Sequence, residues 1–324
     1  MTRLLRPLLG LALAAAVTTN TSAAEPDRLL PAETDVVMSM NVRQLVDSDI
    51  VKQYALGMLK QALDGNDAQK LLKELGLDPL KDIERIVVGA SGKDETDLRT
   101  LLVVRGKFNP EQLYKAAEAQ TRRDADHFTL VKDGRDVMFK YTPDNGNPVY
   151  ATVVDETTVI LSAEKKGITD ALAVPAKAKS ALNKEMAAVV AKMDDKATLW
   201  VAALPNGRLD NLKLKGPAAN PALQNQIANL SSATVVVRVG KDVDLAISLG
   251  MKTADAAEEA GKSVAELVQT AKGILPFLAA NDPKLKPLVE SAKSLKSEVK
   301  DRAVVLTAQL SGKAIGQLLA PGSD

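Results

Sequence analysis

The sequence has no cysteine and only one histidine, His127, among its 324 residues. The absence of thiols excludes disulfides, Cys–His catalysis and zinc sites built on thiolates. A single imidazole also excludes metal sites that need two histidines, and it leaves any Ser-His-Asp triad dependent on His127 alone. Because His127 stands at the start of an expected strand, we interpret it as a surface or edge residue without a catalytic role.

Aromatic residues and a dominant charge are also missing. Aromatics make up 3% of the chain, so the core must consist of Ala, Val, Leu and Ile, and few rings are available to stack on sugars or bases. The 42 Lys and Arg residues nearly balance the 41 Asp and Glu residues. Because such a chain has no strongly basic surface, we expect no nucleic-acid partner. A chain of 324 residues, 46% of them hydrophobic, is long enough for about two domains with substantial cores.

The first 24 residues have the features of a secretory signal peptide. Arg3 and Arg6 form a basic start, and the apolar run over 8–17 is shorter than the roughly 20 residues that span a bilayer. The small residues Ser22-Ala23-Ala24 predict cleavage between Ala24 and Glu25, with Ala23 as the alternative site. We therefore expect an exported protein, periplasmic or extracellular. Without cysteine it is not a lipoprotein, and no later stretch is apolar enough for an integral membrane span.

Strand-like and helix-like segments alternate irregularly along the rest of the chain, and most strands come in adjacent pairs. The apolar residues of 36–42 recur with the two-residue period of a half-buried strand. Asn109, followed by Pro110 and then Gln112, is typical of a capped helix start. Asp133-Gly134 indicates a tight turn between two strands. Further strands are expected at 83–90, 98–105, 150–154, 158–162, 197–204, 233–239, 242–249 and 302–308, and further helices at 51–75 with a break at 65–67, after Thr253, at 284–297 and at the C-terminus.

The two halves of the chain resemble each other. VILSA at 159–163 and VVLTA at 304–308 are each followed by a short helical segment, and the strand pair before Asn109 matches the pair before Thr253. The segment 173–184 has no strand character and predicts the joint between the halves. We therefore expect an α+β fold of antiparallel sheets with helices packed on one face, in two tandem related halves. The expected units are a signal peptide (1–24), an N-terminal α+β half (25–178) and a C-terminal α+β half (179–324).

Two segments resemble a known group of proteins. LPAETDVVMSMNVRQLVDS at 30–48, after a signal peptide, and LGLDPLKDIERIVVGAS at 75–91 are similar to segments of an uncharacterised family of exported bacterial proteins. The resemblance covers most of the mature chain. It implies a folded extracytoplasmic protein, and because the family has no known activity it implies no site residues.

Serine–lysine catalysis needs no histidine, and the chain has two S-x-x-K matches, at 162–165 and 297–300. The companion S-D-N and K-T-G motifs of such enzymes are absent. The first match aligns with Thr307 and Leu310 in the second half, so its lysine is not repeated. We therefore interpret the first serine as a packing residue at a strand end, and the second as part of a charged helical face.

Two further patterns are interpreted as structural. Gly261-Lys262-Ser263 matches the end of a phosphate-binding loop, but Ala256 stands where that loop needs glycine, and the surrounding pattern is helical. Acidic clusters at 94–97, 124–126 and 144–147 lack the spacing of an EF-hand and are typical of turns. A hydrolase that uses paired carboxylates stays open, because such pairs meet only in the folded chain.

Three classes of function follow. The leading prediction is an exported, non-catalytic structural or binding module of the cell envelope or extracellular space, with no catalytic, cofactor-binding or metal residues. The second is a carrier for an apolar ligand or lipid in a groove between helices and sheet, where Met38, Met40 and Met58 would fit, although they also fit an ordinary core. The third is a carboxylate-based hydrolase. The expected partner is an unidentified protein or a small apolar ligand, and we expect a partner contact at the long loop 205–221.

Overall fold

The computed structural model of the chain describes residues 23–64, 75–92, 97–133, 136–144, 146–206, 226–282 and 285–319. Within them the chain forms twelve strands, joined by helices and turns. The strands, in chain order, are β1 (Val36–Asn41), β2 (Ile83–Ser91), β3 (Arg99–Gly106), β4 (Phe128–Asp133), β5 (Asp136–Tyr141), β6 (Val149–Asp155), β7 (Thr158–Ser162), β8 (Leu199–Ala203), β9 (Leu230–Val239), β10 (Asp242–Met251), β11 (Lys296–Lys300) and β12 (Ala303–Ser311).

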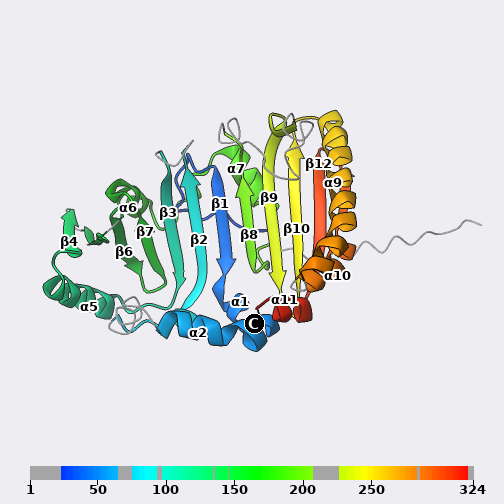
Figure 1. Ribbon diagram of the computed structural model, residues 1–324. Helices are drawn as coiled ribbons and strands as arrows, with labels where there is room; N and C mark the ends of the chain where they lie inside the picture. The colour runs from blue at the N-terminus through cyan, green and yellow to red at the C-terminus, as the bar shows by residue number, and fades with distance from the viewer. Residues whose placement is uncertain are drawn as a thin grey trace, which may run out of the picture.

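All twelve strands belong to one sheet, and every neighbouring pair is antiparallel (Figure 1). The strand order is β11-β12-β10-β9-β8-β1-β2-β3-β7-β6-β5-β4. β1 and β8 therefore join the N-terminal and C-terminal strands into one continuous sheet. The α+β class and the antiparallel pairing predicted from the sequence are confirmed.

The helices are short, with the exception of one that follows β10. They are α1 (Val42–Asp47), the π-helix η1 (Val51–Ala55), α2 (Leu56–Asp64), α4 (Pro79–Asp82), α5 (Pro110–Arg123), α6 (Lys165–Leu172), α7 (Lys184–Val190), α9 (Ala254–Asn281), α10 (Lys286–Ser294) and α11 (Gly312–Leu319). The Asn109 side chain accepts a hydrogen bond from the Gln112 N–H at 3.1 Å, and the Thr253 hydroxyl accepts one from the Ala256 N–H at 3.1 Å. These caps start α5 and α9 at the residues where the sequence predicts helix starts.

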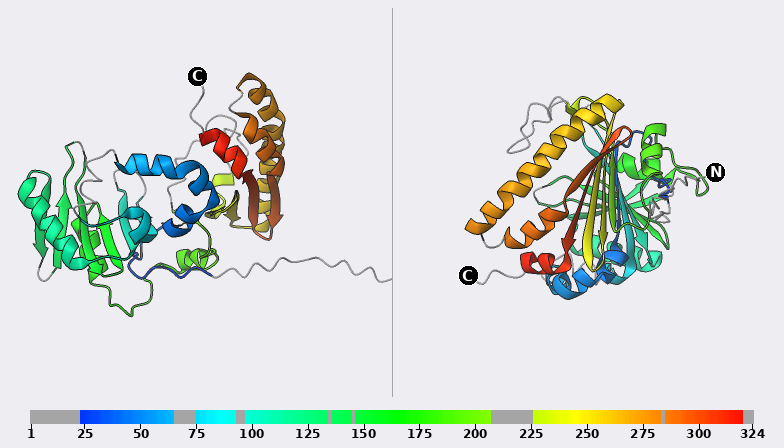
Figure 2. Two further views of the ribbon diagram at one scale, coloured as in Figure 1. Left: turned by 90° about the horizontal axis from the view of Figure 1, so that it is seen from below. Right: turned by 90° about the vertical axis from the view of Figure 1, so that its right-hand side faces the viewer.

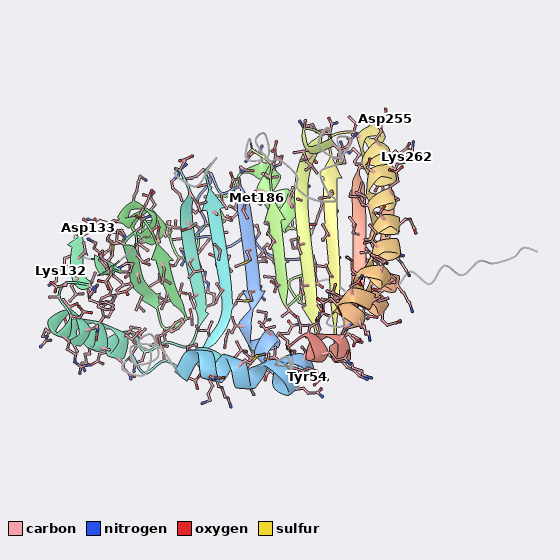
Figure 3. The ribbon with its side chains drawn as sticks, in the orientation of Figure 1. Tyr54, Lys132, Asp133, Met186, Asp255 and Lys262 are labelled. Atoms are coloured by element: carbon pink, nitrogen blue, oxygen red, sulfur yellow. The ribbon has the colours of Figure 1, made fainter. Side chains whose placement is uncertain are left out.

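Successive side chains of a strand point to opposite faces of the sheet. We name the two faces after neighbouring residues of β1: the Val37 face and the Met38 face. The main core cluster lies on the Val37 face, where Val37 and Val103 pack with Ile168 of α6 and Met186 of α7. Figure 2 shows α7 and α9 on opposite sides of the sheet, and Figure 3 labels Met186 on α7.

The Met38 face has two smaller clusters, one toward each end of the sheet. Toward β12, Ala257 and Val264 of α9 pack with Val304. Toward β7, Leu113 of α5 packs with Val104. The helices therefore cover parts of both faces, whereas the sequence analysis predicts them on one. The reason is that the strands are apolar on both sides, as in the run of apolar residues from Ile86 to Val88, so both faces need cover.

Two element boundaries also differ from the prediction. The helix expected at 284–297 ends at Ser294, whose hydroxyl exchanges hydrogen bonds with the backbone of Gln309 in β12, and Ser297 lies in β11 rather than on a helical face. In the β4–β5 hairpin Asp133 pairs with Asp136, so Asp133, which the sequence predicts in the turn, is the last residue of β4. The predicted break at 65–67 and nearly all of the loop at 205–221 lie outside the described residues.

Candidate functional site

An apolar area occupies the middle of the Met38 face. Strand pairing places Met38 between Val88 of β2 and Val201 of β8, and the same row continues through β9 to β10. A second row, two residues along each strand, passes through Met40 and Leu199. We call these nine side chains the central apolar face: Met38, Met40, Val88, Leu199, Val201, Val235, Val237, Leu245 and Ile247.

The central apolar face is only partly covered. All nine residues are half-buried, and none belongs to the three clusters of buried core residues. The described helices pack nearer the ends of the sheet: α9 mainly on β10, β11 and β12, and α5 on β4 and β6. In Figure 1 the middle strands β1, β8 and β9 face the viewer, and no described helix crosses them.

The chemistry of this face is uniform. None of the nine side chains carries a charge, an N–H group or a hydroxyl, so the face offers only apolar contact to a ligand. Strands lie about 4.8 Å apart, so the five strands from β10 to β2 span about 19 Å. A contiguous apolar area that stays accessible to water is typical of a binding site for an apolar ligand or partner.

Only part of this site is apparent from the sequence. Met38 and Met40, which we expect to fit an apolar-ligand carrier, both lie on the central apolar face. Met58 lies on α2 and is 43% exposed. Leu245 and Ile247 alternate visibly in the sequence, but only the pairing of β10 with β9 places them beside the others.

The serines of the two S-x-x-K matches have structural surroundings. Ser162 is 5% exposed; its hydroxyl donates to the Thr100 carbonyl at 2.9 Å and accepts from the Glu164 N–H at 3.2 Å. Lys165 pairs with Asp133 at 3.0 Å rather than with the serine. In the second match the serine and the lysine lie three residues apart on β11, so their side chains point to opposite faces of the sheet.

The Gly261-Lys262-Ser263 segment lies inside α9, about two turns from its start. Backbone N–H groups at that depth already bond within the helix and are not available to a phosphate. Lys262 is exposed and points away from the sheet in Figure 3. The structure therefore gives this segment a helical role, as the sequence pattern predicts.

His127 lies between two carboxylates, an environment that the sequence does not reveal. Its two ring nitrogens each lie 2.8 Å from a carboxylate oxygen, Nδ1 from Asp124 and Nε2 from Asp144. Hydrogen bonds donated by the ring, first to Asp144 and then to Asp124, raise the pKa of His127 from 6.5 to about 9, so the imidazolium form dominates at neutral pH. A cationic ring held by two carboxylates is a structural ion pair and a poor general base. Asp144 lies 17 positions after His127 in the chain, so no local motif reveals this pairing.

The described residues contain no cluster of three or more metal-ligating side chains. No helix in the described part of the chain is long and apolar enough to cross a membrane. Comparisons with protein-family models, with curated proteins and with solved structures find no match. The site must therefore be interpreted from its own chemistry.

Proposed function

We propose that this chain is an exported, non-catalytic binding protein of the cell envelope or extracellular space, and that its ligand is an acyl chain bound on the central apolar face. The observation that carries the proposal is the row of apolar side chains through Met38 and Val201, half-buried over neighbouring strands without a described helix above them. An ordinary core would bury such residues almost completely. A ligand without hydrogen-bonding groups matches a surface without them.

The expected affinity for an acyl chain is that of a carrier that binds its ligand reversibly. Each methylene that is fully removed from water contributes about 0.8 kcal/mol. A chain of roughly 16 carbons lying on one open face, with half of its surface covered, would gain about 6 kcal/mol, which corresponds to a dissociation constant of about 0.05 mM. The span of about 19 Å across five strands accommodates a chain of that length.

The test is the binding of a fluorescent fatty acid and its displacement by unlabelled palmitate. The variant Val201→Thr/Val235→Thr places two hydroxyls on the central apolar face without changing side-chain size. Burying each hydroxyl without a partner costs about 1–3 kcal/mol, so affinity should fall by about tenfold or more. The matched control, Val149→Thr/Val299→Thr, makes the same changes at exposed valines outside this face (37% and 41% exposed) and should bind normally.

Two results would reject this function. One is the absence of saturable binding by the wild-type protein. The other is an equal loss of affinity in the test and control variants when circular dichroism shows both folded. A ligand that co-purifies with the protein from its own envelope, detected by native mass spectrometry, would identify the physiological chain.

We also propose that the two halves arose by tandem duplication. Counting outward from the central pair, the strands run β1-β2-β3-β7-β6 on one side and β8-β9-β10-β12-β11 on the other. α5 follows β3 as α9 follows β10, and α6 follows β7 as α11 follows β12. Superposition of β1, β2, β3 and β7 on their counterparts in an experimental structure tests this proposal; side chains that face opposite ways after superposition would reject it.

For export, the packing of the segment next to the leader favours the alternative cleavage site. Ala24 is 3% exposed, and its N–H donates to the Met193 carbonyl at 3.0 Å, whereas Ala23 is exposed and forms only an isolated bridge with Asp194. Cleavage after Ala24 would remove a residue that contributes to the main core. We therefore propose cleavage after Ala23, so that the mature chain begins at Ala24.

A further inference from the structure

A small cavity lies on the Val37 face, away from the central apolar face. It has a volume of about 130 Å³ and is enclosed between the segment 25–27 and strands β1, β2, β3 and β8. Two arginines, two acidic residues, one serine and one tryptophan supply its polar groups. The lining residues are Glu25, Pro26, Asp27, Val37, Ser39, Arg85, Val87, Arg105 and Trp200.

Trp200 forms one wall of this cavity and has an unfulfilled hydrogen-bonding group. The residue is 3% exposed, and its buried indole N–H has no acceptor among the described residues. Buried N–H groups in native proteins almost always have an acceptor, because leaving one unpaired is costly. The cavity beside the ring is the space where such an acceptor could bind.

The two arginines are held in place by partners at the margins of the cavity. Arg105 donates to the Asp27 carboxylate at 2.7 Å and to the Thr158 hydroxyl at 2.6 Å. Arg85 forms an ion pair with Asp195, and its Nη1 lies 3.5 Å from the Ser39 hydroxyl. Each guanidinium has five N–H donors. Arg105 uses two of them and keeps three for a ligand. Arg85 also donates from Nη2 to the carbonyl and the carboxylate of Asp195 and keeps only its Nε–H, so a ligand would bind mainly to Arg105.

The acceptors of the cavity are largely occupied. Both oxygens of Asp27 already accept hydrogen bonds, Oδ1 from the Leu29 N–H and Oδ2 from Arg105. Glu25 is exposed and lies at the margin. The groups left for a ligand are therefore mainly donors: the indole N–H, the Ser39 hydroxyl and the remaining guanidinium N–H groups.

We propose that this cavity binds a small monocarboxylate of about four to six non-hydrogen atoms, such as acetate or lactate. Its volume equals that of about four waters, which sets the size of the ligand. A planar carboxylate matches the fork of a guanidinium, and Val37 and Val87 can contact its methyl group. Because each arginine is already paired with an aspartate, Arg105 with Asp27 and Arg85 with Asp195, a monoanion suits the site better than a phosphate dianion.

The test uses Trp200, which is the only tryptophan in the chain and gives a single indole N–H signal in an NMR spectrum. Titration with acetate, and separately with lactate, should shift this signal saturably, with a dissociation constant for acetate no lower than about 0.05 mM, because so small a ligand makes few contacts. Inorganic phosphate should shift it at least tenfold more weakly. Equal or tighter binding of phosphate would overturn the carboxylate assignment, and no saturable shift with any of the three anions would overturn the site.

Variants separate this site from general effects on the fold. Arg105→Lys keeps the charge but removes the fork, and it should weaken acetate binding at least tenfold. Arg238→Lys is the matched control, because Arg238 forms a similar pair with Asp194 at 2.6 Å outside the cavity lining, and it should bind acetate normally. An equal effect of both substitutions would contradict the proposal. Failure of this site would leave the acyl-chain proposal unaffected, since that ligand binds on the opposite face.

Discussion

Two glycines of the long helix α9 have opposite surroundings, and a single methyl group added to each should have opposite effects on stability. A Cβ at Gly273 would have no atom within 4 Å. A Cβ at Gly261 would lie 2.3 Å from the Cγ2 of Val299 in β11. The variants Gly273→Ala and Gly261→Ala therefore measure the same helix-propensity change with and without a steric conflict.

The magnitudes follow from these contacts. Replacing glycine by alanine inside a helix stabilises by about 1 kcal/mol, and Gly273→Ala should show most of that gain. At Gly261 the new carbon would stand more than 1 Å inside the normal contact distance of about 3.5 Å, and such overpacking costs about 1–3 kcal/mol. Gly261→Ala should therefore be neutral or destabilising by up to about 2 kcal/mol. The two variants should differ by about 1–3 kcal/mol.

Urea denaturation, followed by circular dichroism and by Trp200 fluorescence, measures the difference in the free energy of unfolding. The control combines Gly261→Ala with Val299→Ala, which removes the conflicting methyl group. In this double variant the free energy of unfolding should be no lower than in Val299→Ala alone. If Gly261→Ala stabilises the protein as much as Gly273→Ala does, α9 does not pack on β11 as the structure describes.

Three further predictions concern His127, Ser162 and the start of the mature chain. Because the folded state raises the pKa of His127 from 6.5 to about 9, protonated His127 stabilises fully below about pH 6.5, and its contribution disappears as the pH rises through 9. Urea midpoints of wild type and His127→Gln should therefore converge between about pH 6 and pH 10, and a gap that widens would refute the ion pair. Ser162→Ala removes the hydrogen bonds to the Thr100 carbonyl and from the Glu164 N–H and should lower the free energy of unfolding by about 1–2 kcal/mol in urea, whereas an unchanged value would show these bonds to be unimportant. The proposed export and cleavage predict an intact mass that corresponds to a chain starting at Ala24, and a mature chain lacking Ala24 would contradict the proposed site.

The parts of the fold that are determined by residues close together in the sequence could be predicted. The cap at Asn109 and the hairpin of β9 and β10 follow from local patterns, a polar cap before a helix and alternating apolar residues. The helix expected over 284–297 was partly wrong, because the charges of KSEVK fit a solvated helix and a solvated edge strand equally well. Only the pairing of 296–300 with β12, a tertiary contact, distinguishes the two.

The candidate site was less accessible to prediction than the fold. Alternation identified an apolar side for β1, including Met38, but not the strands beside it. The neighbour of β1 is β8, and Met38 lies opposite Val201, more than 160 residues away in the chain. No local pattern encodes that pairing, nor the two carboxylates at His127. The sequence therefore predicts which strands have an apolar side, and the folded sheet determines how those sides combine.

The outermost described strands also bear on the association of this protein with copies of itself. An open sheet presents backbone N–H and C=O groups at its two borders, where a further chain could add and start a fibre. The border at β11 carries exposed Lys296, Glu298 and Lys300. A strand of another molecule would have to remove water from these ionised groups to pair there. The charges of this border therefore disfavour end-to-end polymerisation, which matters for a sheet whose central apolar face is only half-buried.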